Sequence, residues 1–375
     1  MIIGLDAKRF FTNATGLGTY ARTTIQALAR YQKGLRLVLF TPTATGPFAP
    51  QVPAQVEVVA PRLPRSLAPL WRSFALPRDV ARAGVHIYHG LSHELPLVPL
   101  PRGVRSVVTV HDLLFLSHPH RYPAVDRLLY RLKYQASIAK AHCILAISQA
   151  TRQELMERLA VPAERIRVAY QACPEVYFGP PPVAPPAVRQ RLGLARDFVL
   201  FVGSLIPRKG AATLVEAVGR LPRPQRPALV LAGAGPLESS LRQQAQRLGV
   251  SATFLGHVAA ELLPGLYGAA QLLAYPSEAE GFGLPIVEAL ACGTPVLTST
   301  GSCFAEAGGP GAIYTPPADA ERLAQAMARV LEDSALAENL RQAGRAHVVA
   351  NFHPQAVAAR LAAIYREILE APCTR

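Results

Sequence analysis

The amino-acid sequence predicts an α/β protein built from two doubly wound domains, each with a mostly parallel β-sheet. Short apolar runs alternate with helical stretches along both halves of the chain, a pattern typical of strands covered by helices on both faces. A segment with six prolines, CPEVYFGPPPVAPPAV (173–188), interrupts this alternation near the middle. The length of 375 residues is long for one hydrophobic core and sufficient for two.

The first half opens with the β-rich run IIGLDA (2–7). It continues with GLGTYARTTIQALARY (16–31), whose apolar residues recur at helical spacing. Helices are also predicted over 124–141 and 149–159. We therefore expect residues 1–175 to form a Rossmann-like domain. Its further strands are predicted at 35–41, 56–60, 85–90, 104–112, 143–148 and 166–170.

Residues 176–187 are predicted to be a linker, because proline fixes φ and removes a backbone donor. Alternation then resumes, which predicts a second Rossmann-like domain over 188–352. The last helix begins with Pro354 at its first position and has no strand to feed. We expect residues 353–375 to pack back across the domain interface. The second set of strands is predicted at 198–204, 228–233, 252–258, 272–277 and 295–299.

Composition limits the class of protein. Half of the residues are hydrophobic and 17% are charged, which favours globular domains over disorder. No run of about 18 uncharged apolar residues occurs, and the N-terminus MIIGLDAKRF lacks the residue order of a secretory signal. The five cysteines form no Cys-x-x-Cys pair, so neither a disulfide framework nor a zinc site is expected. We expect a cytoplasmic protein that holds no metal ion or cofactor.

The positive charge is concentrated in the first half. The net charge is +14. Residues 1–175 carry 22 Lys and Arg against 10 Asp and Glu, whereas residues 176–375 carry 17 against 15. This asymmetry indicates an anionic partner, although 34 of the 39 basic residues are arginine and coding bias is an alternative explanation. No zinc-finger, helix-turn-helix or RNP-like motif accompanies the charge, so a nucleic-acid partner is not expected.

In open parallel sheets, ligands bind beyond the carboxyl ends of the strands, so the turns that follow strands are the candidate sites. In TGLGTYA (15–21), the pattern Gly16-x-Gly18-x-x-Ala21 raises an alternative function, an NAD-dependent oxidoreductase. The glycines do not follow their strand directly, and the ribose-binding acid about 20 residues later is missing. Glycines at a helix start still allow close approach of backbone to phosphate.

Two further turns carry suitable side chains. Arg208 and Lys209 follow the strand at 198–204 and precede a helix, as a diphosphate site would require. His111 and Asp112 stand where the strand at 104–112 leaves the sheet, and a histidine there can donate to a substrate hydroxyl or act as an acid or base. A local turn role for His111 is the alternative.

The most informative stretch is SEAEGFGLPIVEALACGTPVL (277–297). Gly281 and Gly283 leave their N–H groups open to close contact, and a helix is predicted from about Leu284. Glu280 stands at the mouth of the turn, and Glu288 lies one turn into the helix. Acids spread along a turn rich in N–H donors suit a long polar ligand with hydroxyls at two places and phosphate between them, such as a nucleotide-sugar.

The Glu280-(seven residues)-Glu288 stretch, with Gly-Phe-Gly-Leu-Pro inside it and Cys-Gly-Thr-Pro-Val after it, resembles the signature of retaining GT-B glycosyltransferases of family GT4. TGLGTY, VHDLLFL, ILAISQATRQEL, ERIRVAY, FVGSLIPRKG and FLGHV fall in the order of that family and extend the resemblance over nearly the whole chain. One departure lies in SCFAEAGG (302–309), where Ala305 stands in place of a proline common in the family.

The resemblance implies two Rossmann-like domains facing a central cleft, with the acceptor on the N-terminal side. It implies that Glu280 faces the transferred sugar and that His111 contacts that sugar, which makes these two the catalytic candidates. Glu288 would bind the ribose hydroxyls. The other implied donor-binding residues are Gly16, Gly18, Arg208, Lys209, Val258, Gly281, Phe282, Gly283 and Leu284.

The resemblance further implies a function. The chain is expected to transfer a hexose, with mannose from GDP-mannose preferred over UDP-glucose, to a glycan or lipid-linked acceptor in cell-surface polysaccharide synthesis. Fixed cations and helix N–H groups would stabilise the leaving diphosphate, so the site has less need of a metal.

Peripheral contact with an anionic membrane is also expected, from the stretch 61–82. It interleaves five arginines with apolar residues, and Trp71 would sit at headgroup depth. The alternative is that Trp71 fills the domain core.

Overall fold

The computed structural model describes residues 1–61, 70–194 and 197–371, and the chain divides into two compact units. Unit 1 comprises Met1–Ala172 together with Pro354–Arg375, and unit 2 comprises Cys173–His353. The C-terminal segment thus returns to the first unit.

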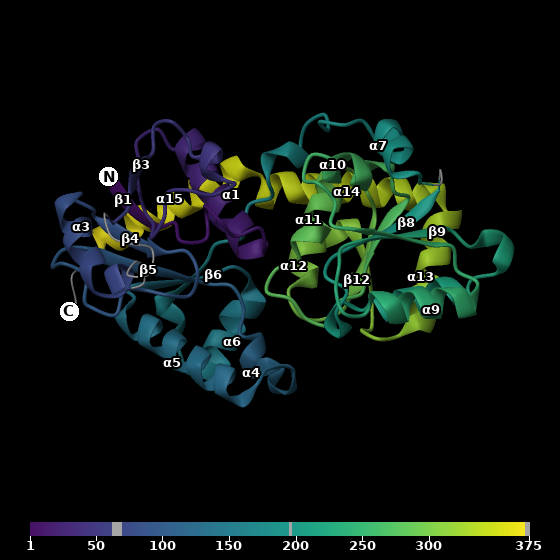
Figure 1. The fold of residues 1–375 in the computed structure, drawn as a ribbon, viewed down its shortest axis with the longest axis horizontal. Helices are drawn as coiled ribbons and strands as arrows, with labels where there is room; N and C mark the ends of the chain where they lie inside the picture. Colours follow the sequence, from purple (N-terminus) through teal and green to yellow (C-terminus); the bar gives the residue numbers. More distant parts are fainter. Residues whose placement is uncertain (62–69, 195–196, 372–375) are drawn as a thin grey trace. The chain divides into compact units, whose positions relative to one another are not determined.

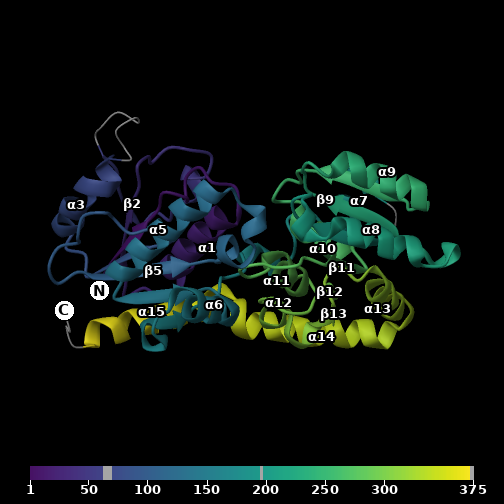
Figure 2. The same ribbon diagram turned by 90° about the horizontal axis from the view of Figure 1, so that it is seen from below.

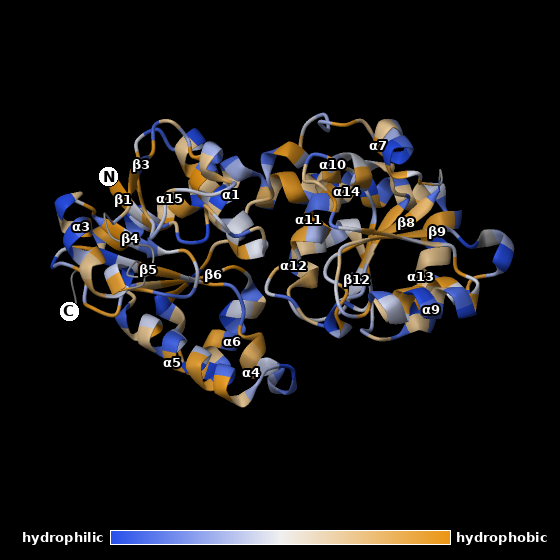
Figure 3. Ribbon diagram, viewed as in Figure 1, coloured by the Kyte–Doolittle hydropathy of each residue, from blue (hydrophilic) through white to orange (hydrophobic). Residues whose placement is uncertain are grey.

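The described strands of unit 1 form one parallel sheet with the order β3-β2-β1-β4-β5-β6-β7. The order reverses between β1 and β4, which pair in parallel on either side of the switch point. Figure 3 shows that the strands are mostly hydrophobic, as expected for a sheet covered on both faces. The strands are β1 (Ile2–Asp6), β2 (Arg36–Phe40), β3 (Glu57–Val59), β4 (Ile87–Gly90), β5 (Arg105–Val110), β6 (Cys143–Ala146) and β7 (Ile166–Val168).

Helices cover both faces of this sheet. Figure 1 shows α1 and α15 on one face and α5 and α6 on the other, and α1 packs against α15. The side chain of Ser148 caps α6 by accepting a hydrogen bond from the Thr151 N–H. The helices of unit 1 are α1 (Gly16–Tyr31), α3 (Leu76–Arg82), α4 (Leu114–Ser117), α5 (Ala124–Lys140), α6 (Gln149–Leu159) and α15 (Pro354–Glu370); η3 (Trp71–Ala75) is a π-helical turn, and η1 (Ala49–Gln51), η4 (Pro119–Arg121) and η5 (Ala163–Arg165) are 3-10 turns.

Unit 2 repeats this topology with the order β10-β9-β8-β11-β12-β13, again all parallel. The switch point lies between β8 and β11. The edge strand β13 was not predicted, because its short sequence AIYT follows a glycine-rich segment and lacks the length of the other apolar runs. The strands are β8 (Phe198–Val202), β9 (Ala228–Ala232), β10 (Ala252–Gly256), β11 (Leu272–Tyr275), β12 (Val296–Ser299) and β13 (Ala312–Thr315).

Helices α8, α9 and α13 pack together over the main core of unit 2, to which α14 contributes Ala337 and Leu340 (Figure 2). Helix α11 packs against α10 and α14. The predicted linker is wrong at its C-terminal end, because α7 begins at Pro185 and packs against α10. Proline is tolerated in a first helical turn, so this proline pair starts a helix. The helices are α7 (Pro185–Leu192), α8 (Ala211–Arg220), α9 (Glu238–Leu248), α10 (Leu263–Ala269), α11 (Leu284–Ala291), α12 (Phe304–Gly308), α13 (Ala320–Glu332) and α14 (Ser334–Phe352), with short turns η6 (Glu175–Tyr177), η7 (Pro207–Lys209), η8 (Arg223–Gln225) and η9 (Gly309–Gly311).

The described part of the stretch 61–82 does not present Trp71 and Arg72 at the surface, as an interfacial segment would require. Trp71 is 4% exposed, and its indole N–H donates to Asp79 Oδ2 over 2.8 Å, so it fills the core and does not lie at a surface. Arg72 is equally engaged, with ion pairs to Asp6 and Glu94. Part of the predicted stretch, including Arg62, Arg65 and Leu67, lies outside the described residues.

Candidate active site

The turn after β8 brings Arg208 and Lys209 to the switch point of unit 2. They lie in η7, and Gly210, the N-cap residue directly before α8, has a φ of 72° in the left-handed region. A Cβ at Gly210 would lie 2.1 Å from the carbonyl oxygen of Pro276. Only glycine allows this approach, which holds the basic turn against the segment that follows β11.

Glu280 gathers the polar groups of both turns onto one oxygen. Its Oε1 accepts hydrogen bonds from Lys209 Nζ at 2.6 Å, Ser277 Oγ at 2.6 Å and Tyr275 OH at 3.0 Å, and Arg208 Nη1 lies 2.7 Å away. Burial alone would raise the pKa of Glu280, but the two cations outweigh it and lower the pKa below its ordinary value. Glu280 is therefore a carboxylate at neutral pH.

This arrangement holds the cations of Arg208 and Lys209 where a negatively charged group could bind. Burial lowers the pKa of Lys209, while Glu280 acts against that shift and favours the ammonium form. A diphosphate entering the site would share both cations with the carboxylate. Positive charge fixed in a largely buried place stabilises a leaving phosphate as its charge grows.

Ser302, in the turn after β12, holds the backbone of Glu280 through two hydrogen bonds. The sequence did not predict this role. The Ser302 hydroxyl accepts a hydrogen bond from the Glu280 N–H over 3.1 Å and donates to the Glu280 carbonyl over 2.8 Å. Its φ of 49° is in the left-handed region, which is costly for a non-glycine residue. The available signal was its place directly after Gly301, where a tight turn follows a strand.

The glycine turn of unit 2 leads into α11 at Leu284, as predicted. Gly283 has a φ of 91°. Phe282 is 4% exposed, and its ring packs edge-on against Phe352 at 5.2 Å, so its backbone alone can face a ligand. Gly281 and Leu284 remain partly exposed on either side.

Glu288 lies deeper than Glu280. It is 8% exposed, and its Oε2 accepts a hydrogen bond from Tyr267 OH over 2.8 Å. Burial raises the pKa of Glu288 to about 7, although hydrogen bonds from Tyr267 and Tyr177 pull it down. The carboxyl group is therefore close to half ionised at neutral pH. Val258 is buried as well, but it follows β10, which is an edge strand of the sheet.

His111 belongs to unit 1, where it follows β5. It is 5% exposed, and burial lowers its pKa to about 4, so the ring is neutral. Its Nε2 lies 2.8 Å from the carbonyl oxygen of Leu91. A carbonyl only accepts, so Nε2 carries the proton and Nδ1 is left as an acceptor. The expected donation to a substrate hydroxyl must therefore be reversed: His111 can accept from one.

The surroundings of His111 fix its orientation. Its ring meets Tyr20 edge-on at 4.5 Å and His93 at 4.9 Å, and its backbone N–H donates to His93 Nδ1 over 3.3 Å. Asp112 accepts from the Leu114 N–H, which is a local turn contact.

The two glycines at the start of α1 differ in their surroundings. A Cβ on Gly18 would lie 1.8 Å from the carbonyl oxygen of Asn13, and the Gly18 N–H donates to Thr15 O and to Asn13 Oδ1. Gly18 is thus required for packing. Gly16 has open space around its Cα. Residues 7–15 separate β1 from these glycines, unlike a dinucleotide fingerprint.

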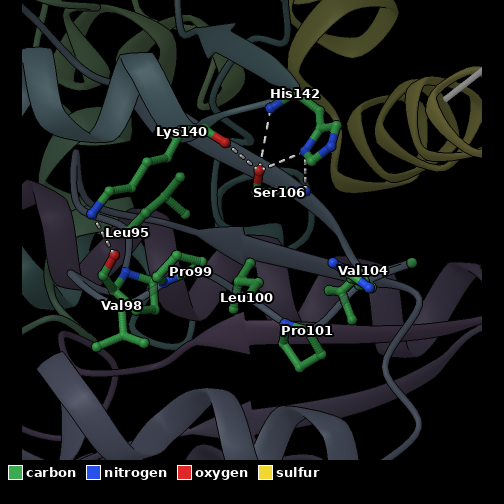
Figure 4. A pocket seen from close by; sticks show the side chains of 12 residues that line it. Leu95, Val98, Pro99, Leu100, Pro101, Val104, Ser106, Lys140 and His142 are labelled. Atoms are coloured by element: carbon green, nitrogen blue, oxygen red, sulfur yellow. Dashed lines mark hydrogen bonds between the residues drawn. The ribbon is translucent and has the colours of Figure 1, made fainter. Parts of the chain in front are cut away.

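A cavity of about 550 Å³ in unit 1 lies near the amino ends of β5 and β6, and Figure 4 shows the side chains that line it. It is lined by Val104, Ser106 and His142, near the starts of β5 and β6, together with Lys140. Because the turns that carry the candidate groups lie at the carboxyl ends of the strands, this cavity is not the candidate active site.

No helix in the described ranges is long and apolar enough to cross a bilayer. Likewise, the described part of the chain brings no three His, Cys, Asp or Glu side chains together as a metal site.

Comparison with solved structures defines the fold class. The fold resembles sucrose-phosphate synthase of Thermosynechococcus elongatus, with a TM-score of 0.76 and 24% identity over 99% of this chain and 100% of that one. It also resembles HepE of Anabaena in complex with UDP-glucose, with a TM-score of 0.74 and 22% identity over 98% and 99% of the two chains. Two Rossmann-order sheets with this likeness define the GT-B fold of glycosyltransferases.

The sequence comparisons narrow this class to one family. Residues 14–173 match the family described as Glycosyltransferase Family 4, and residues 188–347 match Glycosyl transferases group 1. O-antigen chain mannosyltransferase B of Escherichia coli is 32% identical over 343 residues, which cover 86% of this chain and 89% of that protein. The chain belongs to this family of glycosyltransferases. None of these matches supports the oxidoreductase alternative.

Proposed function

We propose that the chain transfers a hexose from a nucleoside-diphosphate sugar with retention of configuration, and that the donor is GDP-mannose, with UDP-glucose as the second choice. The observation that carries this proposal is the convergence of Arg208, Lys209 and Glu280 at the switch point of unit 2. Mannose is favoured because the similar Escherichia coli protein is an O-antigen chain mannosyltransferase. UDP-glucose follows from the ligand of the similar HepE structure.

In the proposed reaction, the bond between the sugar C1 and the diphosphate oxygen breaks, and its electron pair stays on that oxygen. Arg208 and Lys209 stabilise the charge that develops there. The acceptor hydroxyl attacks the same face of the sugar, and its proton passes to the departing phosphate. Glu280 Oε2, on the side of the carboxylate opposite the donors to Oε1, faces a sugar hydroxyl. Glu288 binds the ribose.

A screen of purified protein with GDP-mannose, UDP-glucose and ADP-glucose tests this proposal by measuring nucleoside diphosphate release. Release should be fastest from GDP-mannose. Lys209→Ala should slow it, while Lys33→Ala, an exposed lysine of unit 1, should leave it unchanged. Release from none of the three donors by folded protein would contradict the proposal.

We further propose that the acceptor is a glycan or lipid-linked sugar of cell-surface polysaccharide synthesis, met at the inner face of an anionic membrane. The support is an outer stripe on α5, made of Val125, Leu128, Leu129 and Leu132. These side chains are 68%, 59%, 49% and 55% exposed. At about 100° per residue they share one arc of the helix.

This outer stripe faces away from the domain. The buried side chains of α5 are Tyr134, Ser137 and Ile138, which project about 180° from the stripe. Arg131 and Lys133 flank the stripe, and Asp126 is the one acid of α5, so an apolar surface with a mainly basic border faces solvent, a composition suited to anionic lipid.

Sedimentation with vesicles tests the membrane contact. The protein should pellet with anionic vesicles, stay in solution with neutral ones and be released by high salt. Replacing Leu128 and Leu132 with serine should abolish pelleting, whereas Val349→Ser, which changes a 46% exposed apolar side chain on α14, should not. Equal pelleting of the stripe variant and the control would refute the role of α5.

A further inference from the structure

A second cavity of unit 1, of about 270 Å³, lies at the topological switch point of the sheet. Lys8, which follows β1, and Glu94, which follows β4, line it from the two strands where the strand order reverses. Its other walls come from η3, from the segment after Glu94 and from the second half of α5. We call this cavity the switch-point groove. In open parallel sheets this is the place where ligands bind.

The switch-point groove carries an excess of positive charge. Arg72 is held tightly, with its guanidinium nitrogens 2.5 Å from Asp6 Oδ2 and 2.5 Å from Glu94 Oε2. Lys8 Nζ and Lys133 Nζ lie 3.6 Å and 3.8 Å from the carboxylate of Glu94. Both distances exceed hydrogen-bond length, so these two ammonium groups keep donors for another partner.

A charge count supports the same conclusion. Lys140 also lines the groove and donates to the carbonyl of Pro96. Four cations, Lys8, Arg72, Lys133 and Lys140, therefore stand against the two carboxylates of Asp6 and Glu94, which leaves two positive charges in excess. Burial lowers the pKa of Lys8, and Arg72 and Arg9 lower it further against the opposing effect of Glu94. A dianion bound here would relieve that repulsion.

The rim of the groove is apolar. The N–H of Val98 donates to the Ser73 carbonyl over 3.2 Å and joins the segment after Glu94 to η3. Leu97, which lines the groove, is 56% exposed, and Phe74, which follows the lining residue Ser73 in η3, is 55% exposed. A ligand whose charged end occupies the groove would therefore meet apolar side chains where it emerges.

The groove is adjacent to His111. His93, which precedes Glu94, packs its ring against His111 at 4.9 Å and stacks on Tyr134 at 4.8 Å. Tyr134 in turn follows Lys133 on α5. One layer of side chains thus lies between the groove and the histidine expected at the transferred sugar.

We propose that the switch-point groove binds the diphosphate of a lipid-linked acceptor, with Lys8 and Lys133 donating to phosphate oxygens and the apolar rim contacting the start of the lipid chain. Two excess positive charges match the two negative charges of a diphosphate diester. The identification of this ligand as the acceptor rests on the proposed function, whereas the binding of a lipid diphosphate does not.

Calorimetry with farnesyl diphosphate as the probe tests the groove. The titration is done in protein carrying both Arg208→Ala and Lys209→Ala, so that the basic turn of unit 2 does not contribute. Lys8→Ala and Lys133→Ala should each weaken binding about 10-fold or more. Lys8→Arg should restore most of the affinity, and Lys33→Ala should have no effect. Unchanged affinity in both alanine variants would overturn the proposal.

Two ligand controls separate the parts of the probe. Farnesol should bind at least about 10-fold more weakly, because it lacks the charge, and inorganic pyrophosphate should also bind more weakly, because it lacks the chain. Equal binding of farnesol would overturn the phosphate role, and equal binding of pyrophosphate would overturn the lipid role. In a Leu128→Ser and Leu132→Ser variant, which lacks the α5 stripe, displacement of the probe by vesicles of anionic phospholipid would assign the groove to membrane lipid and overturn the acceptor.

Donor hydrolysis by Lys8→Ala and Lys133→Ala in otherwise wild-type protein distinguishes a failure of this proposal from a failure of the proposed function. Hydrolysis with unaltered probe binding would refute the groove alone. Loss of probe binding in a protein that hydrolyses no nucleotide-sugar would support the groove and refute the proposed function.

Discussion

The sharpest prediction concerns the hydrogen bond from Tyr267 to Glu288. The ribose hydroxyls donate to Glu288 in the proposed complex, so the carboxylate is the binding form. Burial has already raised the pKa of Glu288 to about 7, and the Tyr267 hydroxyl, 2.8 Å from Oε2, is one of the groups that keep it from rising further. Tyr267→Phe removes that hydroxyl and leaves the ring in place.

The size of the effect follows from the hydrogen bond that is lost. A hydrogen bond to a charged group contributes roughly 1.5–3 kcal/mol. At about 1.36 kcal/mol per pH unit, its loss moves the midpoint of the affinity titration upward by about one to two pH units. At pH 7 the ionised fraction of Glu288 falls from about one half to between about one tenth and one hundredth. Nucleotide affinity at pH 7 should therefore fall about 5- to 50-fold.

The assay is calorimetric titration of GDP into wild-type protein, Tyr267→Phe and Glu288→Gln between pH 5.5 and 9.5. Wild-type affinity should rise as pH passes through about 7. The Tyr267→Phe variant should recover its affinity at the alkaline end, and Glu288→Gln should keep only the dependence that the terminal phosphate of GDP, with a second pKa of about 6, imposes on all three proteins. A Tyr267→Phe curve with the wild-type midpoint would refute the role of the hydrogen bond. A transition near pH 7 as large in Glu288→Gln as in wild type would refute the assignment of the titration to Glu288.

Further predictions concern stability and the reacting groups. The folded pKa of Glu288, about 7, lies above its ordinary value of 4.5, so its contribution to stability is present below pH 4.5 and is lost as pH rises through 7. Between pH 4.5 and 7, the free energy of unfolding measured with urea should therefore fall in wild type by up to about 3 kcal/mol more than it falls in Glu288→Gln. An equal fall in both proteins would contradict the presence of a buried acid. Arg208→Ala and Lys209→Ala should lower turnover more than they weaken GMP binding, and equal losses would indicate a purely structural role. Ser302→Gly should lower kcat about 10-fold through two lost hydrogen bonds while GDP affinity stays unchanged; a parallel loss of affinity would count against a positioning role. His111→Ala should reduce transfer without weakening GDP binding, and wild-type transfer would return His111 to a local turn role.

The fold was predictable because the signals were local and strong. Apolar runs such as FVLFVGS, followed by helical spacing, define parallel strands covered on both faces, and the predicted helices 16–31 and 149–159 have the same bounds in the structure. The start of α7 was missed for the opposite reason. Proline-rich composition favours irregular structure, but prolines at a first helical turn remain compatible with a helix.

The site was predictable in its residue types and less so in its geometry. The turns holding Arg208, Lys209 and Glu280 were recognised from the sequence, whereas the brace from Ser302 depends on a turn that follows another strand. The orientation of His111 was also out of reach, since the carbonyl that fixes its proton belongs to Leu91 in a different strand-end turn. Contacts between turns depend on strand order, which a single sequence does not encode locally.

The charge of unit 1 was likewise informative about the kind of partner but not about the surface that would meet it. Its excess of basic residues indicated an anionic partner, but the stretch around Trp71 was selected because arginine and apolar residues alternate there. Three-dimensional packing buries Trp71 and pairs Arg72, and it exposes Leu128 and Leu132 on α5 instead. The expected membrane contact therefore remains a prediction, now placed on a different surface.

The most direct test of the central claim is the anomeric configuration of the product formed from GDP-mannose. Purified protein is incubated with this donor and with farnesyl diphosphate bearing one sugar as the acceptor, and the new glycosidic linkage is examined by NMR. A retaining transferase that uses the Arg208, Lys209 and Glu280 site should give an α-linked mannoside, and Lys209→Ala should give the same linkage more slowly. A β-linked product would contradict the account.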